Sequence, residues 1–283
     1  MKTEENKKQQ HDISVEEIVD NLTLFDDDLM SIVFDANIPA TELILKIILD
    51  RNDIKVVSVV GQRELKNPIA GGRNLRLDIL AKDGQGEYFN VEVQRKNSGA
   101  NERRARFHSS MMDSRMLKKK QKFKELRDSY MIMITQSDYF GNGLSVYTVN
   151  RHIEELNIPF RDGSHIVYVN GNYRGNDSVG RLMQDFSCKK AKDMYHKELA
   201  DGVKHFKEEG GRRLMCEAVE RYARQKAAEA AEKAAIKAAI EAGISYGIDK
   251  KIVLQKVSKK YDITEEEAEK LYNAYASAEV MIR

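Results

Sequence analysis

Two neighbouring stretches near the middle of the chain alternate apolar and polar residues and predict a β-hairpin. Apolar residues recur at every second position of 75–81 and again of 88–94. The Asp-Gly-Gln-Gly segment between them is typical of a turn, so the two strands are expected to pair antiparallel. The apolar side chains then share one face of the hairpin. Asp78, Glu92 and Gln94 lie together on the opposite face.

Helical and strand patterns alternate on both sides of this hairpin. Apolar runs and helix-start signals give the boundaries. We expect a short helix that begins at a capping box over 14–17, and three further helices that include residues 29–33, 42–49 and 107–117. Strands are expected over 56–60, 130–134, 144–149 and 165–170. This order of elements indicates an α/β domain.

The composition changes near Arg212, where the chain becomes rich in Ala, Glu, Lys and Arg and favours a helix that ends at Gly243. Two further helices are expected beyond it. We therefore divide the chain into a disordered tail (1–12), a globular domain (13–211) and a helical extension (212–283). The extension buries little by itself, so we expect it to pack on the body, on a second copy in a homo-oligomer, or on a protein partner.

The composition is that of a soluble globular protein. Of the 283 residues, 41% are hydrophobic and 33% are charged, and the net charge is only +2. Cys188 and Cys216 lie far apart without metal-ligand spacing, which favours a reduced cytoplasm over a disulfide framework. The polar first residues and the absence of a long apolar run predict neither secretion nor a membrane span.

Strand register brings two acids of the hairpin together. If the turn is centred on Gln85, Asp78 lies directly opposite Glu92 at a Cβ separation of about 4.5–5.5 Å, where like charges repel. A cation between them relieves the repulsion, and Mg²⁺ is commonly held by one or two carboxylates plus water and substrate phosphate. A solvated acidic pair on an exposed face gives the same pattern, and a bulge would break the pairing.

Asp78, followed on the next strand by Glu92-Val93-Gln94, resembles the signature of the PD-(D/E)XK nucleases in an E-x-Q form. Further segments make the sequence similar to the PD-(D/E)XK nuclease family transposases, relatives of the recombination-promoting nucleases, over roughly residues 20–215. These segments are Asp26–Met30, Arg76–Ile79, Arg104–Phe107, Gly143–Tyr147, Tyr168–Gly171 and Gly180–Phe186. The resemblance implies a restriction-endonuclease-like core, in which helices flank a mixed central sheet, here with a helical C-terminal extension.

The resemblance also implies an activity, the metal-dependent hydrolysis of DNA phosphodiester bonds. Asp78, Glu92 and the backbone carbonyl of Val93 would hold Mg²⁺, for which Mn²⁺ substitutes. Gln94 replaces the usual lysine and brings no charge. It is expected to orient a water molecule while the metal or Lys96 supplies positive charge.

A further acid is expected in the site from the resemblance. In the family the helix before the sheet supplies an acidic residue, and Glu42 occupies the matching place in this sequence. A first-turn acid that interacts with the helix dipole explains Glu42 equally well. The same dipole interaction is our interpretation of Asp26, Asp27 and Asp28.

The stretch 95–127 is strongly basic, with twelve Lys and Arg against three acids, a net charge of +9. Because it directly follows the expected metal strand, we expect it to contact DNA phosphates, which attract such charge through counterion release. The candidate contacts are Lys96, Arg103, Arg104 and Arg106. A solvated helix face is the alternative explanation of the charges, and His108 in this stretch is interpreted as a hydrogen-bonded helix residue.

The sequence therefore predicts a Mg²⁺-dependent DNA endonuclease, linked to mobile elements or recombination. The alternative function is a non-catalytic DNA-binding or assembly module that keeps the same fold. The joint presence of Glu42, Asp78, Glu92 and Gln94 favours the enzyme.

Overall fold

The computed structural model describes residues 14–67, 71–261 and 263–280. The expected disordered tail lies outside these residues. The chain forms two compact units, 1–217 and 218–283, so the division falls six residues after the boundary drawn from composition. Among the described residues, no helix combines the length and apolarity needed to span a membrane.

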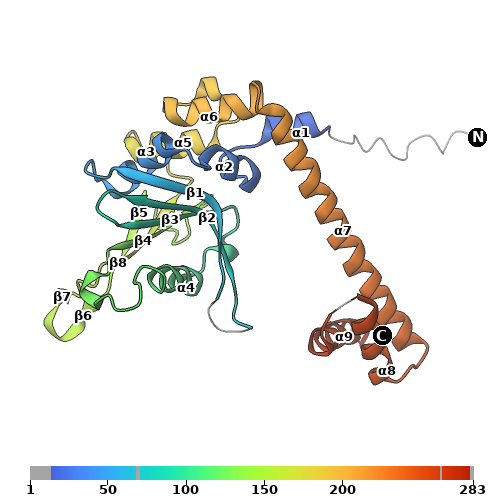
Figure 1. Ribbon diagram of the computed structural model, residues 1–283. Coiled ribbons are helices and arrows are strands. Elements are labelled where there is room, and N and C mark those ends of the chain that lie inside the picture. Colours follow the sequence, from blue (N-terminus) through green and yellow to red (C-terminus); the bar gives the residue numbers. More distant parts are fainter. Residues whose placement is uncertain (1–13, 68–70, 262, 281–283) are drawn as a thin grey trace, which may run out of the picture. The chain divides into compact units, whose positions relative to one another are not determined.

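A mixed six-stranded sheet forms the centre of the first unit (Figure 1). Its order is β1-β2-β3-β4-β8-β5, with β3, β4 and β8 parallel to one another and the other pairs antiparallel. The strands are β1 (Val56–Leu65), β2 (Leu75–Asp83), β3 (Tyr88–Gln94), β4 (Ser129–Thr135), β5 (Val146–Val149) and β8 (Ser164–Asn170). A separate small hairpin pairs β6 (His152–Ile153) with β7 (Ile158–Pro159).

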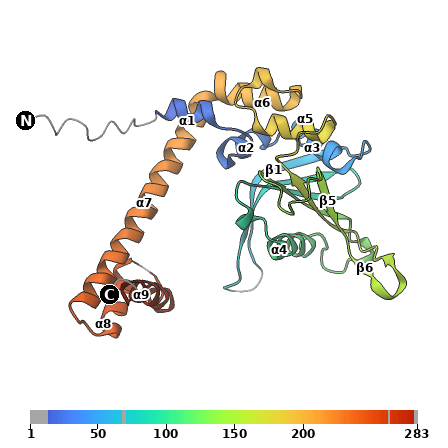
Figure 2. The same cartoon turned by 180° about the vertical axis from the view of Figure 1, so that it is seen from behind.

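Helices cover both faces of the sheet (Figures 1 and 2). Helix α4 lies on one face, and α2, α3, α5 and α6 lie on the other. Their bounds are α1 (Val15–Asn21), α2 (Asp27–Phe34), α3 (Ile38–Leu49), α4 (Glu102–Asp113), α5 (Ser178–Ser187) and α6 (Lys197–Glu208), and single 3-10 turns occur at η1 (Asn97–Gly99), η2 (Phe123–Glu125), η3 (Glu154–Leu156) and η4 (Ala191–Asp193). The expected restriction-endonuclease-like α/β architecture is confirmed.

The expected hairpin register is confirmed. Strands β2 and β3 pair Ile79 with Val91 and Ala81 with Phe89, which is the register of a turn centred on Gln85. The expected separation into two faces is wrong at one end. Leu75 and Leu77 pack in the core cluster that contains residues of α4, and Glu92 contacts α4 as well.

A change of direction in β2 explains this difference. Beyond Ile79, β2 no longer pairs with β3 but continues along β1, where Leu77 pairs with Arg63 and Leu75 with Leu65. At the point of β1 that this register places opposite Asp78, Gln62 adopts the left-handed conformation (φ 47°). Such local irregularity bends a strand pair, and here the bent arm packs against α4.

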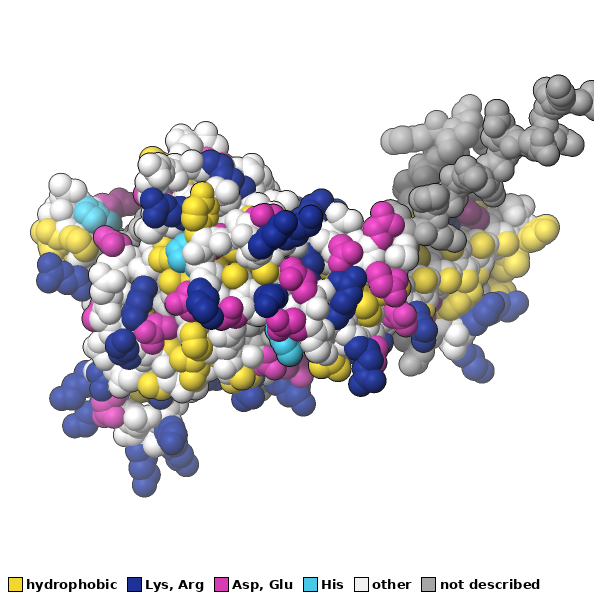
Figure 3. Space-filling model, turned by 90° about the horizontal axis from the view of Figure 1, so that it is seen from above, with side chains coloured by type: hydrophobic (Ala, Val, Ile, Leu, Met, Phe, Trp, Pro, Cys, Tyr) yellow, Lys and Arg dark blue, Asp and Glu magenta, His cyan; other side chains and the backbone are white. Residues whose placement is uncertain are grey.

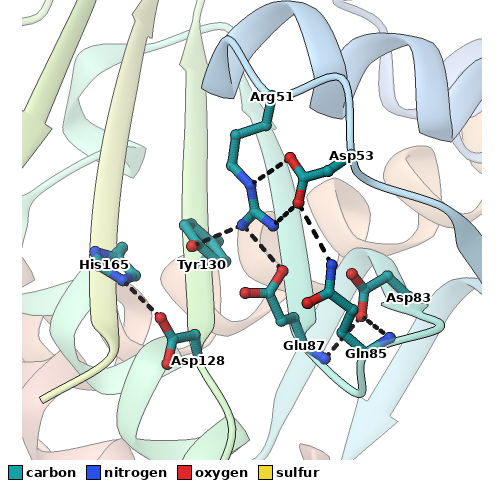
Figure 4. Close-up of polar contacts among 8 residues, drawn as sticks. All are labelled: Arg51, Asp53, Asp83, Gln85, Glu87, Asp128, Tyr130 and His165. Carbon is teal, nitrogen blue, oxygen red and sulfur yellow. Dashed lines mark hydrogen bonds and ion pairs between the residues drawn. The ribbon is translucent and has the colours of Figure 1, made fainter.

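A polar network secures the edge of the sheet where the parallel strands begin (Figure 4). The Arg51 guanidinium contacts Asp53 (2.6 Å), Glu87 (2.9 Å) and the Tyr130 hydroxyl (2.9 Å). The buried Asp83 carboxylate accepts hydrogen bonds from the backbone N–H groups of the β2–β3 turn. These contacts fix the turn and therefore the register that places Asp78 beside Glu92.

The second unit has a small apolar core of its own. It contains most of α7 (Arg212–Ser245), together with α8 (Lys250–Tyr261) and α9 (Glu265–Val280). Ile236 and Ile240 of α7 are buried against Val253 and Val257 of α8 and Ala268 of α9. The last two helices therefore bury their apolar faces on the C-terminal part of α7.

Candidate active site

The two acids of the hairpin lie where the hydrogen-bonded ladder between β2 and β3 stops. Continuing the register would pair Leu77 with Val93. Instead, the Val93 N–H donates to Asp78 Oδ2 (3.1 Å), and the Asp78 N–H donates to Glu92 Oε1 (3.2 Å). Because N–H and C=O of one strand residue point to the same edge, the Val93 carbonyl is also directed toward β2. The carboxylates thus occupy the fork between two separating strands.

Glu92 has no exposed surface and is surrounded by donors from α4. Arg104 Nη2 lies 3.3 Å from Oε2, and His108 Nδ1 lies 3.5 Å from Oε1. The buried His108 also lies 3.4 Å from the Asn90 amide nitrogen, as expected for a hydrogen-bonded helix histidine. A buried carboxylate requires such partners. Arg104 Nε is buried without a hydrogen-bond partner within the described part of the chain.

A cavity of about 1000 Å³ opens at this fork, between the arm of β2 and helix α4. Asp27, Asp78 and Gln94 line it. Five arginines also line it, namely Arg73, Arg76, Arg103, Arg104 and Arg106. The positive side chains outnumber the acids, so the cavity favours an anionic ligand. By contrast, Lys and Arg are interspersed with Asp and Glu on the face shown in Figure 3.

Gln94 is the last residue of β3 and lines the cavity, and its side-chain amide lies against Gly99. A β-carbon at Gly99 would meet Gln94 Oε1, so glycine at this position of the 3-10 turn η1 leaves room for the amide in its present orientation. Gln94 O accepts a hydrogen bond from the Gln136 N–H (2.9 Å), which continues the pairing of β3 with β4. Gln94 is thereby held on a paired strand end that lines the same cavity as Asp78.

Asp27 is a residue of the site that the sequence analysis assigned only to the helix dipole. It begins α2 and lines the cavity. Arg95, directly after β3, forms an ion pair with the neighbouring Asp26 (2.5 Å) and ties α2 to this end of the sheet. Desolvation raises the pKa of Asp27, with Arg76 opposing the shift. A run of acids before an apolar helix was the signal available in the sequence.

Glu42 is not brought to the site, contrary to the expectation from the resemblance. Its carboxylate accepts a hydrogen bond from the Val56 N–H (3.0 Å) and contacts Lys46 and Lys55. Val56 pairs with Asp83, five residues along β2 from Asp78 and therefore roughly 16 Å away. The acidic helix residue near Asp78 is Asp27, because α2 and not α3 reaches the cavity.

The four predicted phosphate-binding residues differ in their surroundings. Arg103 and Arg106 are exposed on α4 and line the cavity, whereas Arg104 is engaged with Glu92. Lys96 is exposed just before η1 and does not line the cavity. Arg73 and Arg76 were not singled out from the sequence, although Arg76 precedes Asp78 by two residues on the same strand.

The comparisons support a nuclease-type domain. Residues 36–172 match the family model described as PD-(D/E)XK nuclease family transposase. The match includes Asp78, Glu92, Gln94 and α4 but not Asp27. The comparisons with curated proteins and with solved structures found no significant match.

Asp78 carries the electrostatic cost of this arrangement. Desolvation, followed by the charge of Glu92, raises the pKa of Asp78 to about 8. In the unfolded chain the carboxyl loses its proton near pH 4. Between these values the folded protein holds a proton that the unfolded chain lacks, so stability falls as the pH rises.

We expect the metal-free protein to lose stability between about pH 4 and pH 8 through this residue. Asp78→Asn removes the titrating group, so the difference in unfolding free energy between wild type and variant should change with pH across this range. Urea unfolding at a series of pH values measures it. A constant difference would show that Asp78 ionises normally.

Proposed function

We propose that this protein is a metal-dependent DNA endonuclease with its active site at the β2–β3 fork. The observation that carries the proposal is that Asp78 lines a cavity together with five arginines and lies beside Glu92, which is fully buried behind the cavity wall. The acids would hold a cation, and the arginines would bind the phosphates of a nucleic-acid strand. The match of residues 36–172 to a nuclease family model agrees with DNA as the substrate.

The donor set fits a hard divalent cation. No group of three Asp, Glu, His or Cys side chains is arranged for metal binding among the described residues, but Mg²⁺ requires only one or two carboxylates from the protein. Asp78, Glu92 and the carbonyl of Val93 would hold it, all through oxygen. Bound there, the cation would polarise the scissile phosphate and acidify a water molecule.

The side chains of the chain itself have distinct roles in this proposal. Gln94 accepts and donates hydrogen bonds and would orient the attacking water. Arg103 and Arg106 would hold the phosphates on either side of the scissile bond. Arg104 neutralises Glu92 while no cation is bound. Since Gln94 brings no charge, Arg104 is also the group that would stabilise the charge on the phosphate during reaction.

A non-catalytic DNA-binding module with the same fold is the second candidate. Its cavity would need the arginines but not the acids. Keeping a buried glutamate beside a second carboxylate costs stability and serves no packing purpose, which favours catalysis. The acids at the fork therefore distinguish the two functions experimentally.

Glu92→Gln should abolish Mg²⁺-dependent nicking of supercoiled plasmid while leaving the fold intact, because the amide keeps the shape of the side chain but not its charge. Asp78→Asn should act alike, and the double variant should be scarcely worse than either single one, since both residues serve one ion. Gel electrophoresis measures the nicking, and calorimetry measures Mg²⁺ binding.

The matched control is Glu102→Gln, an exposed acid at the start of α4. It should nick plasmid at the wild-type rate. A folded Glu92→Gln protein that binds Mg²⁺ and cuts normally would place the active site elsewhere. Wild-type protein that binds DNA but no Mg²⁺ or Mn²⁺ would favour the non-catalytic module.

Arg104→Met should tighten Mg²⁺ binding by roughly tenfold, because it removes a positive charge a few ångströms from the place of the cation. Nicking should nevertheless fall. Calorimetry at a pH above the Asp78 titration measures the affinity. Arg103→Met is the control, because it removes an equal charge from α4 without a contact to Glu92. Equal changes in both variants would mean that only net charge matters.

Reversing the charges of Arg103 and Arg106 together should weaken DNA binding and lower the slope of log K against log salt by about two, roughly 0.9 for each lost phosphate contact. Fluorescence anisotropy of labelled DNA across a salt series measures this slope. Charge reversal of the exposed Arg181 and Lys192, on and after α5, changes the net charge equally and should leave the slope unchanged. An unaltered slope in the α4 variant would contradict phosphate contacts there.

A further inference from the structure

The loop between α4 and β4 presents an aromatic side chain directly to water. Phe123 is 90% exposed, the largest exposed fraction of any large apolar side chain among the described residues. A phenylalanine gains about 1.5–3 kcal/mol when it is buried. The fold makes no use of this residue, so its exposure points to an external ligand.

Basic side chains surround Phe123. Residues 118–124 include five exposed lysines, namely Lys118, Lys119, Lys120, Lys122 and Lys124. The one acid of the segment 114–127, Glu125, is engaged: its carboxylate accepts hydrogen bonds from the Lys122 N–H (3.1 Å) and from Gln121 Nε2 (3.3 Å). Because one acid faces five lysines, the loop keeps a net positive charge.

The loop holds its shape through its own hydrogen bonds. The Lys118 N–H donates to Gln121 Oε1 (2.6 Å), and Phe123 begins the 3-10 turn η2. Lys120 adopts the left-handed conformation (φ 76°), which is uncommon for lysine and is maintained by its surroundings. A preorganised loop loses little conformational entropy when a ligand binds to Phe123.

This loop continues the exposed surface that begins at the cavity. Near the start of α4, Arg104 contacts Glu92. At the end of the helix, Asp113 accepts a hydrogen bond from Ser129 at the start of β4 (2.8 Å). These two positions are roughly 14 Å apart along the helix axis. Besides Glu102 in its first turn, the exposed residues of α4 are Arg103, Arg106 and Ser110, and the exposed Ser114 caps the helix. The spacing of these last four residues places them along one side of the helix, and Ser114 lies four residues before Lys118.

We propose that Phe123 is a stacking site for an unpaired nucleobase, with the surrounding lysines holding the adjacent phosphates. The proposal rests on the proposed function, because it extends the path of the same DNA strand away from the active site. Exposed aromatic residues bind bases of any sequence, since every base has a π-face. Bases within a duplex are already stacked, so the site selects a single-stranded segment, flap or frayed end.

Two other ligands would use the same chemistry. An anionic membrane surface binds lysines with an inserted aromatic residue, and an acidic protein partner binds a similar patch. The continuity with the arginine-lined cavity favours DNA. The alternatives are outcomes of the experiment below.

The chain contains no tryptophan, so Phe123→Trp introduces a single fluorescent reporter at the site. In the full-length protein, a thymidine oligonucleotide should quench this fluorescence as its bases stack on the indole. A blunt duplex of equal length should quench it much less. Anisotropy of the labelled oligonucleotide gives binding independently of the tryptophan signal.

Phe123→Leu should weaken binding of the thymidine oligonucleotide by between about fivefold and 150-fold, the range for loss of one base–aromatic stack. The salt slope should stay unchanged, because no phosphate contact is lost. Phe123→Tyr should retain wild-type affinity. Phe160→Leu is the control, since Phe160 is also exposed (52%) but lies after β7, outside the lysine loop.

Three results would overturn the proposal. One is equal oligonucleotide affinity of the Phe123→Leu and wild-type proteins, together with unaltered tryptophan fluorescence on binding. Another is a fluorescence response to phosphatidylglycerol vesicles but not to the oligonucleotide. The third is a response only to a poly-glutamate peptide. If plasmid nicking persists in any of these cases, the proposed function stands. Wild-type protein that neither binds DNA nor nicks plasmid would overturn the stacking site and the proposed function together.

Discussion

The structure depends on the electrostatic repulsion between the Asp78 and Glu92 carboxylates, which lie where the pairing of β2 with β3 ends. Glu92 is fully buried and Asp78 lies beside it, at a point where β2 leaves β3 and main-chain hydrogen bonding stops. The Asp78 carboxylate replaces the missing main-chain acceptor by binding the Val93 N–H. Two like charges in a poorly hydrated place destabilise the fold unless a cation or a proton intervenes. The stability of the apo domain is therefore lowered at the place where chemistry is proposed.

The surrounding elements act to maintain this arrangement. Helix α4 supplies Arg104 and His108 to Glu92, and the ion pair of Arg95 with Asp26 holds α2 near the same end of the sheet. At the opposite edge, the Arg51 network fixes the turn that sets the register (Figure 4). An error of one residue in that register would turn Asp78 to the other face of the sheet. Parts of the chain far from the cavity thus determine its geometry.

Local patterns predicted the sheet and the pair of acids, because a period of two and a turn together determine a hairpin register. The family resemblance supplied the fold class. Neither source located the third acid. Asp27 begins α2 and Glu42 lies within α3, both helices precede the sheet, and only tertiary packing decides which of them reaches the cavity. The pairing of Arg104 with Glu92 was likewise not predicted, since a basic run does not reveal which members face inward. The bend at Gln62 was not predicted either. Glutamine rarely adopts this backbone conformation, and the pattern of apolar residues does not indicate it.

Helix α7 connects two units that each have their own core. Its described side chains between 220 and 235 are all exposed, so they add to neither core. Cooperative unfolding spreads through buried contacts. The two units are therefore expected to behave as separate folding units, in which mutations that destabilise the C-terminal helices leave the first unit folded. The sequence of the C-terminal unit can therefore change without lowering the stability of the unit that carries Asp78 and Glu92.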